Sequence, residues 1–479
     1  MHQNRLWYPL CFFSFSLFLI LIILPLSRQG MFLDGVIYAA IAKNLAIGHG
    51  SLWQPFYSQT NFSVFYEHPP LAIYFQSLLF KLFGQGFGVE QVYCLIIALG
   101  QFALIAWYWL KKENTAFVQL ALLLLIWLLI PLNMKYVNNH LEATLTLFTT
   151  LASLVLLLKA QSKVEFFLQY LISSVAVLIA FFCNGPTAFF PLAVPLIRAL
   201  VNKQTSWYDS IKETIFFALM LAILFCLVYY LVPAALLNTQ HYLAEQLLPS
   251  TIGSRQLNLV GFDHLYIFNL YFRAYWSVSI VVLGYIAVAA KIKGQRIYFL
   301  VLSSLKNNNF LLFFLLSLLS SLPVGVSHRQ ALNYIMQSAP FFTLAMMYLC
   351  FEPVKTIINY FATKPRLLTA SLYLNFLFFI TTLVTVFCLA NGYNAHKEII
   401  TDIKTIIPYC KNDEIISASG AIYHDYHAAA YFARHSMISL ASENGNQYYL
   451  ALKGEALPEN YHLVSLPLSY YNLAIRDKL

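Results

Sequence analysis

The stretch from residue 32 to residue 71, FLDGVIYAAIAKNLAIGHGSLWQPFYSQTNFSVFYEHPPL, lies between the first apolar run of the chain and the next long one. It places Asp34 just after the first apolar run, and Glu67 and His68 directly before two prolines. An ionisable side chain close to hydrocarbon is costly, so acids at such positions are typical of functional sites. We therefore interpret this stretch as the loop that carries the active site.

The composition predicts a polytopic membrane protein. Of 479 residues, 60% are hydrophobic and 10% are charged, and the mean hydropathy is +0.66, which exceeds the apolar share of soluble domains. The net charge of +9 comes from Lys and Arg residues scattered between apolar runs, so we expect no nucleic-acid partner. The seven cysteines show no CxxC spacing, and we predict neither a disulfide nor a thiolate metal site.

The apolar runs predict about eleven transmembrane helices, because a straight span needs about 20 apolar residues. Residues 71–83 form a shorter run, which we interpret as a juxtamembrane or re-entrant helix on the outer side. With that register, the Lys and Arg residues between the later spans fall on the cytoplasmic side, as does the N-terminus. The predicted spans are 7–26, 90–110, 115–132, 142–159, 166–183, 186–201, 213–233, 274–291, 309–325, 332–351 and 367–391.

The last ninety residues differ in character from the rest of the chain. The segments EIISASG, SMISLAS, QYYLALKG and YHLVSLP alternate as short strands do, and His424 to His435 has the pattern of a helix between the first two. We therefore predict two domains. Residues 1–391 form an all-α membrane domain with the outer-face loop 27–89, and residues 392–479 form a small periplasmic α/β domain.

Four pieces of sequence carry a resemblance to a known family. They are LDGVIYAAIAKNL, FYEHPPLAIYFQSLLFKLFG, NNHLEATLTLFTTLA and SHRQALNYIMQSAPFFTLAMMYL, within residues 1–350. In this order and spacing they resemble the GT-C glycosyltransferases that use polyprenyl-phosphate sugars, namely the protein mannosyltransferase and lipid A aminoarabinose transferase group. The resemblance implies a GT-C fold and an inverting enzyme at the outer face of a membrane. The compact chain and the lack of a long luminal insert favour the bacterial inner membrane over a eukaryotic membrane, in which the donor lipid would be dolichyl phosphate. Such an enzyme would move a sugar from an undecaprenyl-phosphate donor to a lipid, glycan or protein acceptor.

Two positions depart from the family pattern. The family often has an Asp-Glu pair where this chain has Asp34-Gly35. Aminoarabinose transferases have Lys where this chain has His68, which is the residue that protein mannosyltransferases show. The class of acceptor therefore stays open.

Asp34 is the expected catalytic residue. An inverting transfer needs a base that takes a proton from the acceptor as it attacks the anomeric carbon, and a carboxylate in a partly desolvated cleft has a raised pKa that suits this role. The resemblance aligns Asp34 with the catalytic acid of the family. The alternative is that Asp34 is the N-cap of a helix that begins near Gly35.

The phosphate of the donor requires cationic or hydrogen-bonding groups on the outer side. We expect His68, Arg329, Arg273 and Tyr334 to bind it. Arg329 lies five residues before Tyr334, much like the basic-to-Tyr element of the family. Each of the arginines can equally be an anchor for the headgroups of membrane lipids.

Glu67 is a candidate ligand for a divalent metal, Zn²⁺ or Mg²⁺, and no cofactor is certain. The resemblance implies that this Glu would share the ion with a His of a later outer loop, for which the candidate is His264 in GFDHLYIFNLY. The alternative is that Glu67 and His264 are ordinary surface residues. Glu142 either orients the site or forms an ion pair with Lys135.

A lipid-linked sugar flippase or transporter is the rival function. Such proteins are built from repeats with paired broken helices near the centre of the bilayer. The sequence shows no such repeat, and its acids stand at the ends of spans rather than within them.

Overall fold

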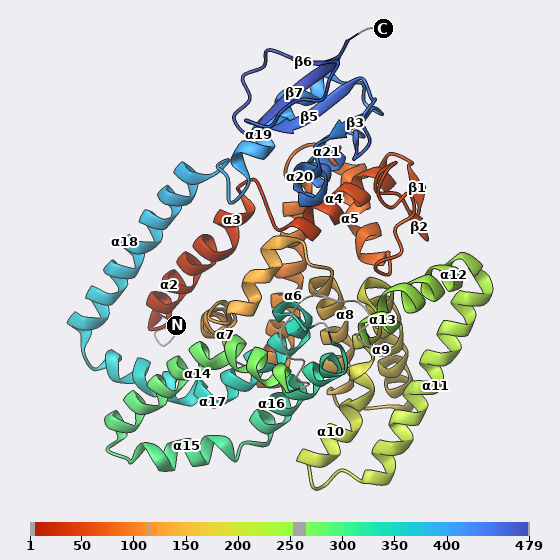
Figure 1. Cartoon of the computed structure of the whole chain (residues 1–479). Helices are drawn as coiled ribbons and strands as arrows, with labels where there is room; N and C mark the ends of the chain where they lie inside the picture. The colour runs from red at the N-terminus through yellow and green to blue at the C-terminus, as the bar shows by residue number, and fades with distance from the viewer. Residues whose placement is uncertain (1–4, 114, 252–264, 329, 478–479) are drawn as a thin grey trace. The chain divides into compact units, whose positions relative to one another are not determined.

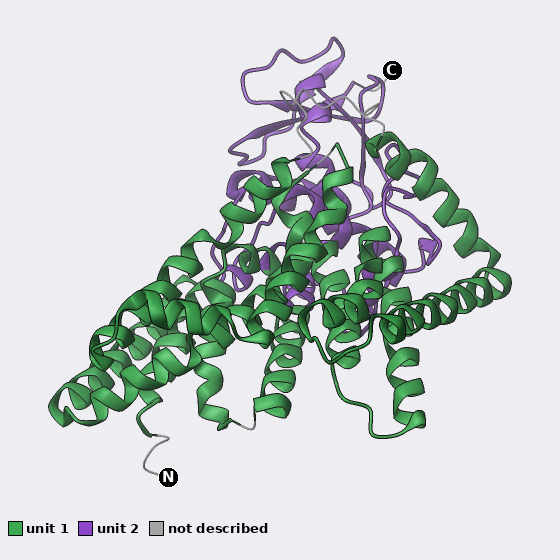
Figure 2. Ribbon diagram, turned by 90° about the horizontal axis from the view of Figure 1, so that it is seen from below, with its two compact units in different colours: residues 1–24, 95–136, 141–389 green, residues 25–94, 137–140, 390–479 purple. Residues whose placement is uncertain are grey.

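The computed structural model describes residues 5–113, 115–251, 265–328 and 330–477. The chain forms two compact units, coloured separately in Figure 2. Unit 1 comprises Met1–Leu24, Leu95–Tyr136 and Leu141–Leu389, and unit 2 comprises Pro25–Cys94, Val137–His140 and Ala390–Leu479. The first long loop therefore belongs to the same unit as the C-terminal segment that begins at Ala390.

Eight helices in the described part of the chain are long and apolar enough to cross a membrane. Two consecutive pieces, Phe117–Leu128 and Pro131–Asn138, are bent by 85° and would form a ninth span together. The two remaining predicted spans correspond to shorter apolar helices, so the count of eleven stays a prediction. The eight are α2–α3 (Tyr8–Leu26), α6 (Val89–Glu113), α9 (Lys163–Asn184), α11 (Trp207–Leu231), α14 (Tyr266–Lys293), α16–η6 (Asn308–Val326), η7–α17 (Leu332–Ala362) and α18 (Pro365–Leu389).

Within unit 1, α8 packs against α9, α17 against α14 and α16, and α2 against α7 and α18 (Figure 1). The most apolar stretches of α11 and α18 have only 11% of their residues buried, so these helices present apolar side chains outward, as lipid-facing helices do. The shorter helices of this unit are α7 (Leu120–Leu128), η3 (Pro131–Asn138), α8 (Leu141–Leu156), η4 (Pro186–Ala193), α10 (Val194–Val201), α12 (Pro233–Tyr242), α13 (Leu248–Thr251) and α15 (Ile297–Leu305).

The first long loop of unit 2 contains α4 (Leu33–Ala46), a small hairpin of β1 (Gly50–Ser51) and β2 (Gln54–Pro55), and α5 (Leu71–Phe83). Helix α5 has the bounds that the sequence predicts. It starts after Pro70, which cannot continue a preceding helix, and ends at Gly84, whose φ of +80° is readily adopted only by glycine. Its buried residues recur at helical spacing, so one face of α5 packs inside the unit.

The C-terminal segment of unit 2 forms a mixed sheet with five strands among the described residues, in the order β4-β3-β5-β7-β6. β3 is parallel to β4 and β5, whereas β7 is antiparallel to β5 and β6. Four strands and the helical region were predicted, while α19 and β7 were not. The elements are α19 (Lys397–Ile406), β3 (Ile415–Ala418), α20 (Gly420–Asp425), α21 (His427–His435), β4 (Ser439–Ala441), β5 (Tyr448–Leu452), β6 (Tyr461–Leu463) and β7 (Tyr471–Arg476).

Helix α4 and the C-terminal segment share one hydrophobic core. Met31 and Val36, at the start of α4, belong to the same buried cluster as Ile400 of α19 and Phe432 of α21. The buried Asp402 carboxylate ties α19 to the final strand, because it accepts hydrogen bonds from three backbone N–H groups and one hydroxyl of residues 469–471. The expected loop and the expected tail domain are therefore folded together.

Candidate active site

Asp34 lies in the first turn of α4, and its side chain is exposed. The helix begins at Leu33 and its N-cap is Phe32, which makes no side-chain capping bond. The alternative interpretation of Asp34 as an N-cap is therefore wrong, because the helix starts one residue before it. The N-terminal turn of a helix carries a partial positive charge, which stabilises an ionised carboxylate. Asp34 thus presents a carboxylate to the surroundings from a rigid helix end.

His68 packs against Tyr38 of α4, the helix that also carries Asp34. Its ring meets the ring of Tyr38 edge to face, with 5.8 Å between centroids, and lies 6.4 Å from that of Phe65. Tyr38 follows Asp34 by four residues on α4, and side chains at this spacing occupy one helix face. The buried prolines 69 and 70 fix the backbone after His68, and Glu67 is half-buried beside it. The structure thus packs His68 against the residue that follows Asp34 by one helical turn.

Asn139 is hydrogen-bonded to the start of α4, although it lies 104 residues later in the sequence. Its side-chain amide donates to the carbonyl oxygen of Gly35 at 2.8 Å and to the side-chain oxygen of Gln76 at 3.3 Å. The next residue, His140, stacks on Phe32 with 4.0 Å between ring centroids. Asn139 has a φ of +54°, a conformation that Asn adopts more readily than most residues. The sequence assigns no role to Asn139 or His140.

Gly35 is required by the close approach of residues 137–140 to α4. A Cβ atom at this position would lie within 3 Å of the carbonyl oxygen of Asn138, and 3.0–3.1 Å from side-chain atoms of Phe32 and Met31. The backbone oxygen cannot move away as a flexible side chain would. The departure from the Asp-Glu pair thus has a structural reason, since this backbone has no room for a second carboxylate next to Asp34.

We expect Gly35→Ala to destabilise unit 2 by about 1–3 kcal/mol, the usual range for overpacking. Thermal unfolding of the detergent-solubilised protein, together with proteolysis of the first loop, measures the effect. Gly284→Ala is the control, because this glycine also lies within a helix but a Cβ atom there would meet nothing within 4 Å. Equal stability of the two variants would contradict the close packing described here.

In unit 1, the predicted residues Glu142 and Tyr334 occur together with two that were not predicted. The buried Glu142, in the first turn of α8, accepts a hydrogen bond from the side chain of Asn333 at 2.8 Å. Burial raises the pKa of Tyr242, and the nearby Tyr334 and Glu142 raise it further, so its hydroxyl remains a donor. The result is a polar cluster, Glu142–Tyr242–Asn333–Tyr334, in which Glu142 and Tyr242 are buried and Asn333 and Tyr334 are half-buried. The ion pair of Glu142 with Lys135 stays a prediction.

The remaining predicted site residues are Arg273, Arg329 and His264. Arg273 lies on α14 and its side chain is exposed, whereas Arg329 and His264 lie outside the described residues. Across the described ranges, no group of three or more His, Cys, Asp or Glu side chains is arranged to hold a metal ion. The pairing of Glu67 with His264 around a metal therefore stays a prediction.

A small pocket of unit 2 lies behind the start of α4. It is lined by Met31, Val36, Glu90, Tyr431 and Arg434, among others, and it encloses about 240 Å³ even when space open to solvent is included. Sites for small molecules usually enclose about 300–1,000 Å³. We therefore do not assign the sugar donor to this pocket.

Comparisons with known proteins bear on the fold. No protein-family model matches the chain, and no curated protein matches it in sequence. The crystal structure of ArnT from Cupriavidus metallidurans bound to undecaprenyl phosphate matches with a TM-score of 0.63, over 97% of each chain at 11% identity. Its apo form matches with a TM-score of 0.60, over 97% of this chain and 96% of that one at 12% identity. ArnT is a lipid A aminoarabinose transferase of the GT-C class. The chain has a GT-C fold.

The GT-C fold confirms the resemblance predicted from the four pieces of sequence, and it agrees with the apolar helices in identifying a multi-pass membrane protein. The archaeal oligosaccharyltransferase AglB from Archaeoglobus fulgidus also matches, with a TM-score of 0.43 over 91% of this chain and 68% of that one at 12% identity. This second likeness is too loose to support an argument about the site.

Proposed function

We propose that this protein is an inverting glycosyltransferase that moves a sugar from an undecaprenyl-phosphate donor to a lipid, glycan or protein acceptor. The observation that carries the proposal is the GT-C fold, matched over nearly the whole chain by a protein captured with undecaprenyl phosphate. The exposed carboxylate of Asp34, at the start of the helix against which His68 packs, supplies the base that the reaction needs. We place the reaction at the outer face of the bacterial inner membrane, with the C-terminal segment in the periplasm.

In the proposed reaction, Asp34 takes the proton from the acceptor hydroxyl or amine as that atom bonds to the anomeric carbon. The bond from this carbon to the phosphate oxygen breaks, and polyprenyl phosphate leaves with the electron pair. Attack from the side opposite the phosphate inverts the anomeric centre. Developing charge on the phosphate is stabilised by donors such as Tyr334, His68 and Arg273, and from the sequence also by Arg329.

The proposal is tested by the fate of the donor. Purified protein in lipid nanodiscs is incubated with a panel of undecaprenyl-phosphate sugars and with membrane extract as the source of acceptor. We expect one donor to be converted to free undecaprenyl phosphate, detected by mass spectrometry. An intact donor in every case would contradict the proposal. Movement of an intact donor between the leaflets of a vesicle would identify the rival flippase.

A further inference from the structure

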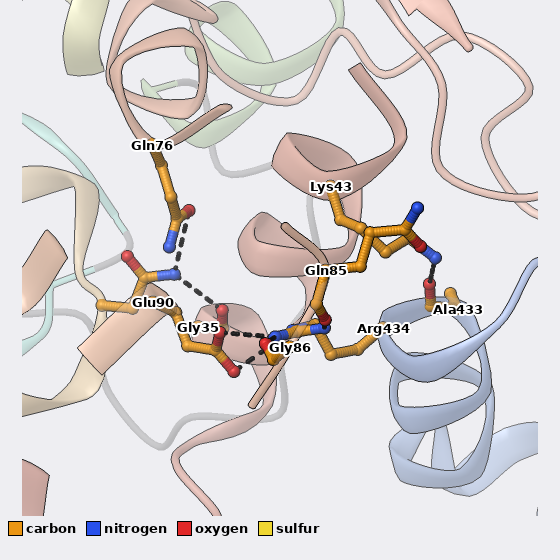
Figure 3. A network of polar contacts seen from close by, with 9 residues as sticks. Gly35, Lys43, Gln76, Gln85, Gly86, Glu90, Ala433 and Arg434 are labelled. Carbon is orange, nitrogen blue, oxygen red and sulfur yellow. Dashed lines mark hydrogen bonds and ion pairs between the residues drawn. The ribbon is translucent and has the colours of Figure 1, made fainter. Parts of the chain in front are cut away.

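We propose that helix α21 of the C-terminal segment fixes the position of the first long loop, residues 27–89, which we call the catalytic loop. Lys43 and Arg434 are then positioning residues for the transfer. The inference rests on the proposed function and adds a role for the tail, to which the sequence assigned none. It rests on two buried basic side chains within unit 2, and Figure 3 shows their contacts with Ala433, Gln85, Gly86 and Glu90.

Lys43 caps the C-terminal end of α21. Its side chain is 1% exposed, and its Nζ donates to the carbonyl oxygen of Ala433 at 2.6 Å and to that of Ser436. Carbonyl groups at the end of a helix have no partner within the helix, so Lys43 satisfies groups that burial would otherwise leave unpaired. Burial and the charge of Arg434 lower the pKa of Lys43 to about 7, and in either protonation state the amine has at least two N–H groups for these two acceptors.

The position of Lys43 connects this cap to Asp34. Both residues lie on α4, nine positions apart, which corresponds to roughly 13 Å along the helix axis. Both residues belong to one continuous helix. A displacement of the backbone at Lys43 therefore also displaces the turn that carries Asp34.

Arg434 connects the same helix α21 to the segment after His68. Its guanidinium donates from Nε and Nη2 to the two oxygens of Glu90, at 3.2 and 2.8 Å, and further to the carbonyl oxygens of Gln85 and Gly86 at 3.1 and 2.8 Å. The planar group also lies over the ring of Phe80, 4.8 Å from its centroid. Arg434 thereby fixes the end of α5, the loop after it and the start of α6.

Together the two basic side chains connect α21 to two parts of the catalytic loop, namely α4 and the end of α5. Lys43 belongs to the helix that carries Asp34, and Arg434 fixes the far end of α5, whose first residue follows the His68-Pro-Pro element. The positions of Asp34 and of the segment that carries His68 thus both depend on a helix near residue 430. Misplacement of reacting groups by about 1 Å can cost about 10²-fold in rate, so the effect of losing this support is measurable.

The test is Lys43→Met, which keeps an unbranched side chain of nearly the same length and removes its donors. We expect kcat to fall by about 10- to 100-fold with KM changed less than about threefold, because positioning acts on the transition state rather than on donor binding. Lys411→Met is the control, since this lysine belongs to the same unit but is exposed. In the same samples, hydrogen exchange should speed up at residues 33–46 and remain unchanged in α17.

Arg434→Lys is a second, milder variant, which keeps a charge opposite Glu90 but cannot reach both carbonyl groups. A folded Lys43→Met or Arg434→Lys protein with wild-type kcat and wild-type exchange at residues 33–46 would overturn the inference. A purely structural role would lower the yield of folded protein and leave kcat per folded molecule unchanged, which would also overturn it. Absence of transfer in the wild type would instead defeat the proposed function, while the exchange measurement would still test the support of α4.

Discussion

Asp34→Asn is expected to lower the rate of sugar transfer by about 10²–10⁴-fold, the usual contribution of a general base. Asparagine keeps the size and the hydrogen-bonding capacity of the residue but cannot accept the proton of the acceptor. Since Asp34 is exposed and lies outside the shared hydrophobic core, the protein should fold and insert as before. Release of undecaprenyl phosphate under single-turnover conditions measures the chemical step apart from product release.

Asp209→Asn provides a matched control for this experiment. Asp209 is also an exposed aspartate in the first turn of a helix, α11, so the substitution makes the same local change at the end of another helix dipole. We expect it to leave turnover near the wild-type rate. Near-normal turnover in Asp34→Asn would remove this residue from the mechanism and leave the proton to another group.

Arg434→Met is expected to destabilise unit 2 by about 3–5 kcal/mol, because it leaves a buried carboxylate without its partner. The side chains of Arg434 and Glu90 are 2% and 6% exposed, so water cannot replace the lost bonds. The carbonyl groups of Gln85 and Gly86 would also lose their donor. Hydrogen exchange of the C-terminal segment in detergent gives the change in the free energy of opening for this unit alone.

The double variant Arg434→Met/Glu90→Met distinguishes loss of the ion pair from loss of packing. Removing both charges eliminates the unpaired carboxylate, so we expect the double variant to be more stable than Arg434→Met. Arg476→Met is the surface control, because this arginine is exposed at the end of the last strand. A double variant as unstable as the single one would indicate that the pair contributes shape rather than charge.

Local patterns were sufficient for much of the fold. The apolar runs identify a multi-pass membrane protein, the pair Pro69-Pro70 and Gly84 delimit α5, and period-two alternation identifies four strands of the tail. These features depend on neighbours within about ten residues. The missed strand β7 contains Asn472 and Ala474, which have low strand propensity, and its pairing with the distant β5 determines its conformation.

The candidate site was predicted only in part. Asp34 and His68 could be named because a polar residue next to an apolar run is conspicuous, and Glu142 and Tyr334 because they fall in pieces that resemble a family. Tyr242, Asn333 and Asn139 carry no such signal. Their relevance comes from distant partners. Asn333 bonds to Glu142, 191 residues away, and Asn139 bonds to Gly35, 104 residues away.

By itself, the sequence determined the membrane class, the GT-C resemblance and the residue proposed as the base. Only the tertiary structure decided that the first loop folds with the C-terminal segment, that Gly35 leaves no room for a second acid, and that Lys43 caps α21. The physical reason is that burial of a lysine or an arginine depends on acceptors supplied across about 340 to 390 residues of chain. The spacing of residues along the sequence contains no information about such partners.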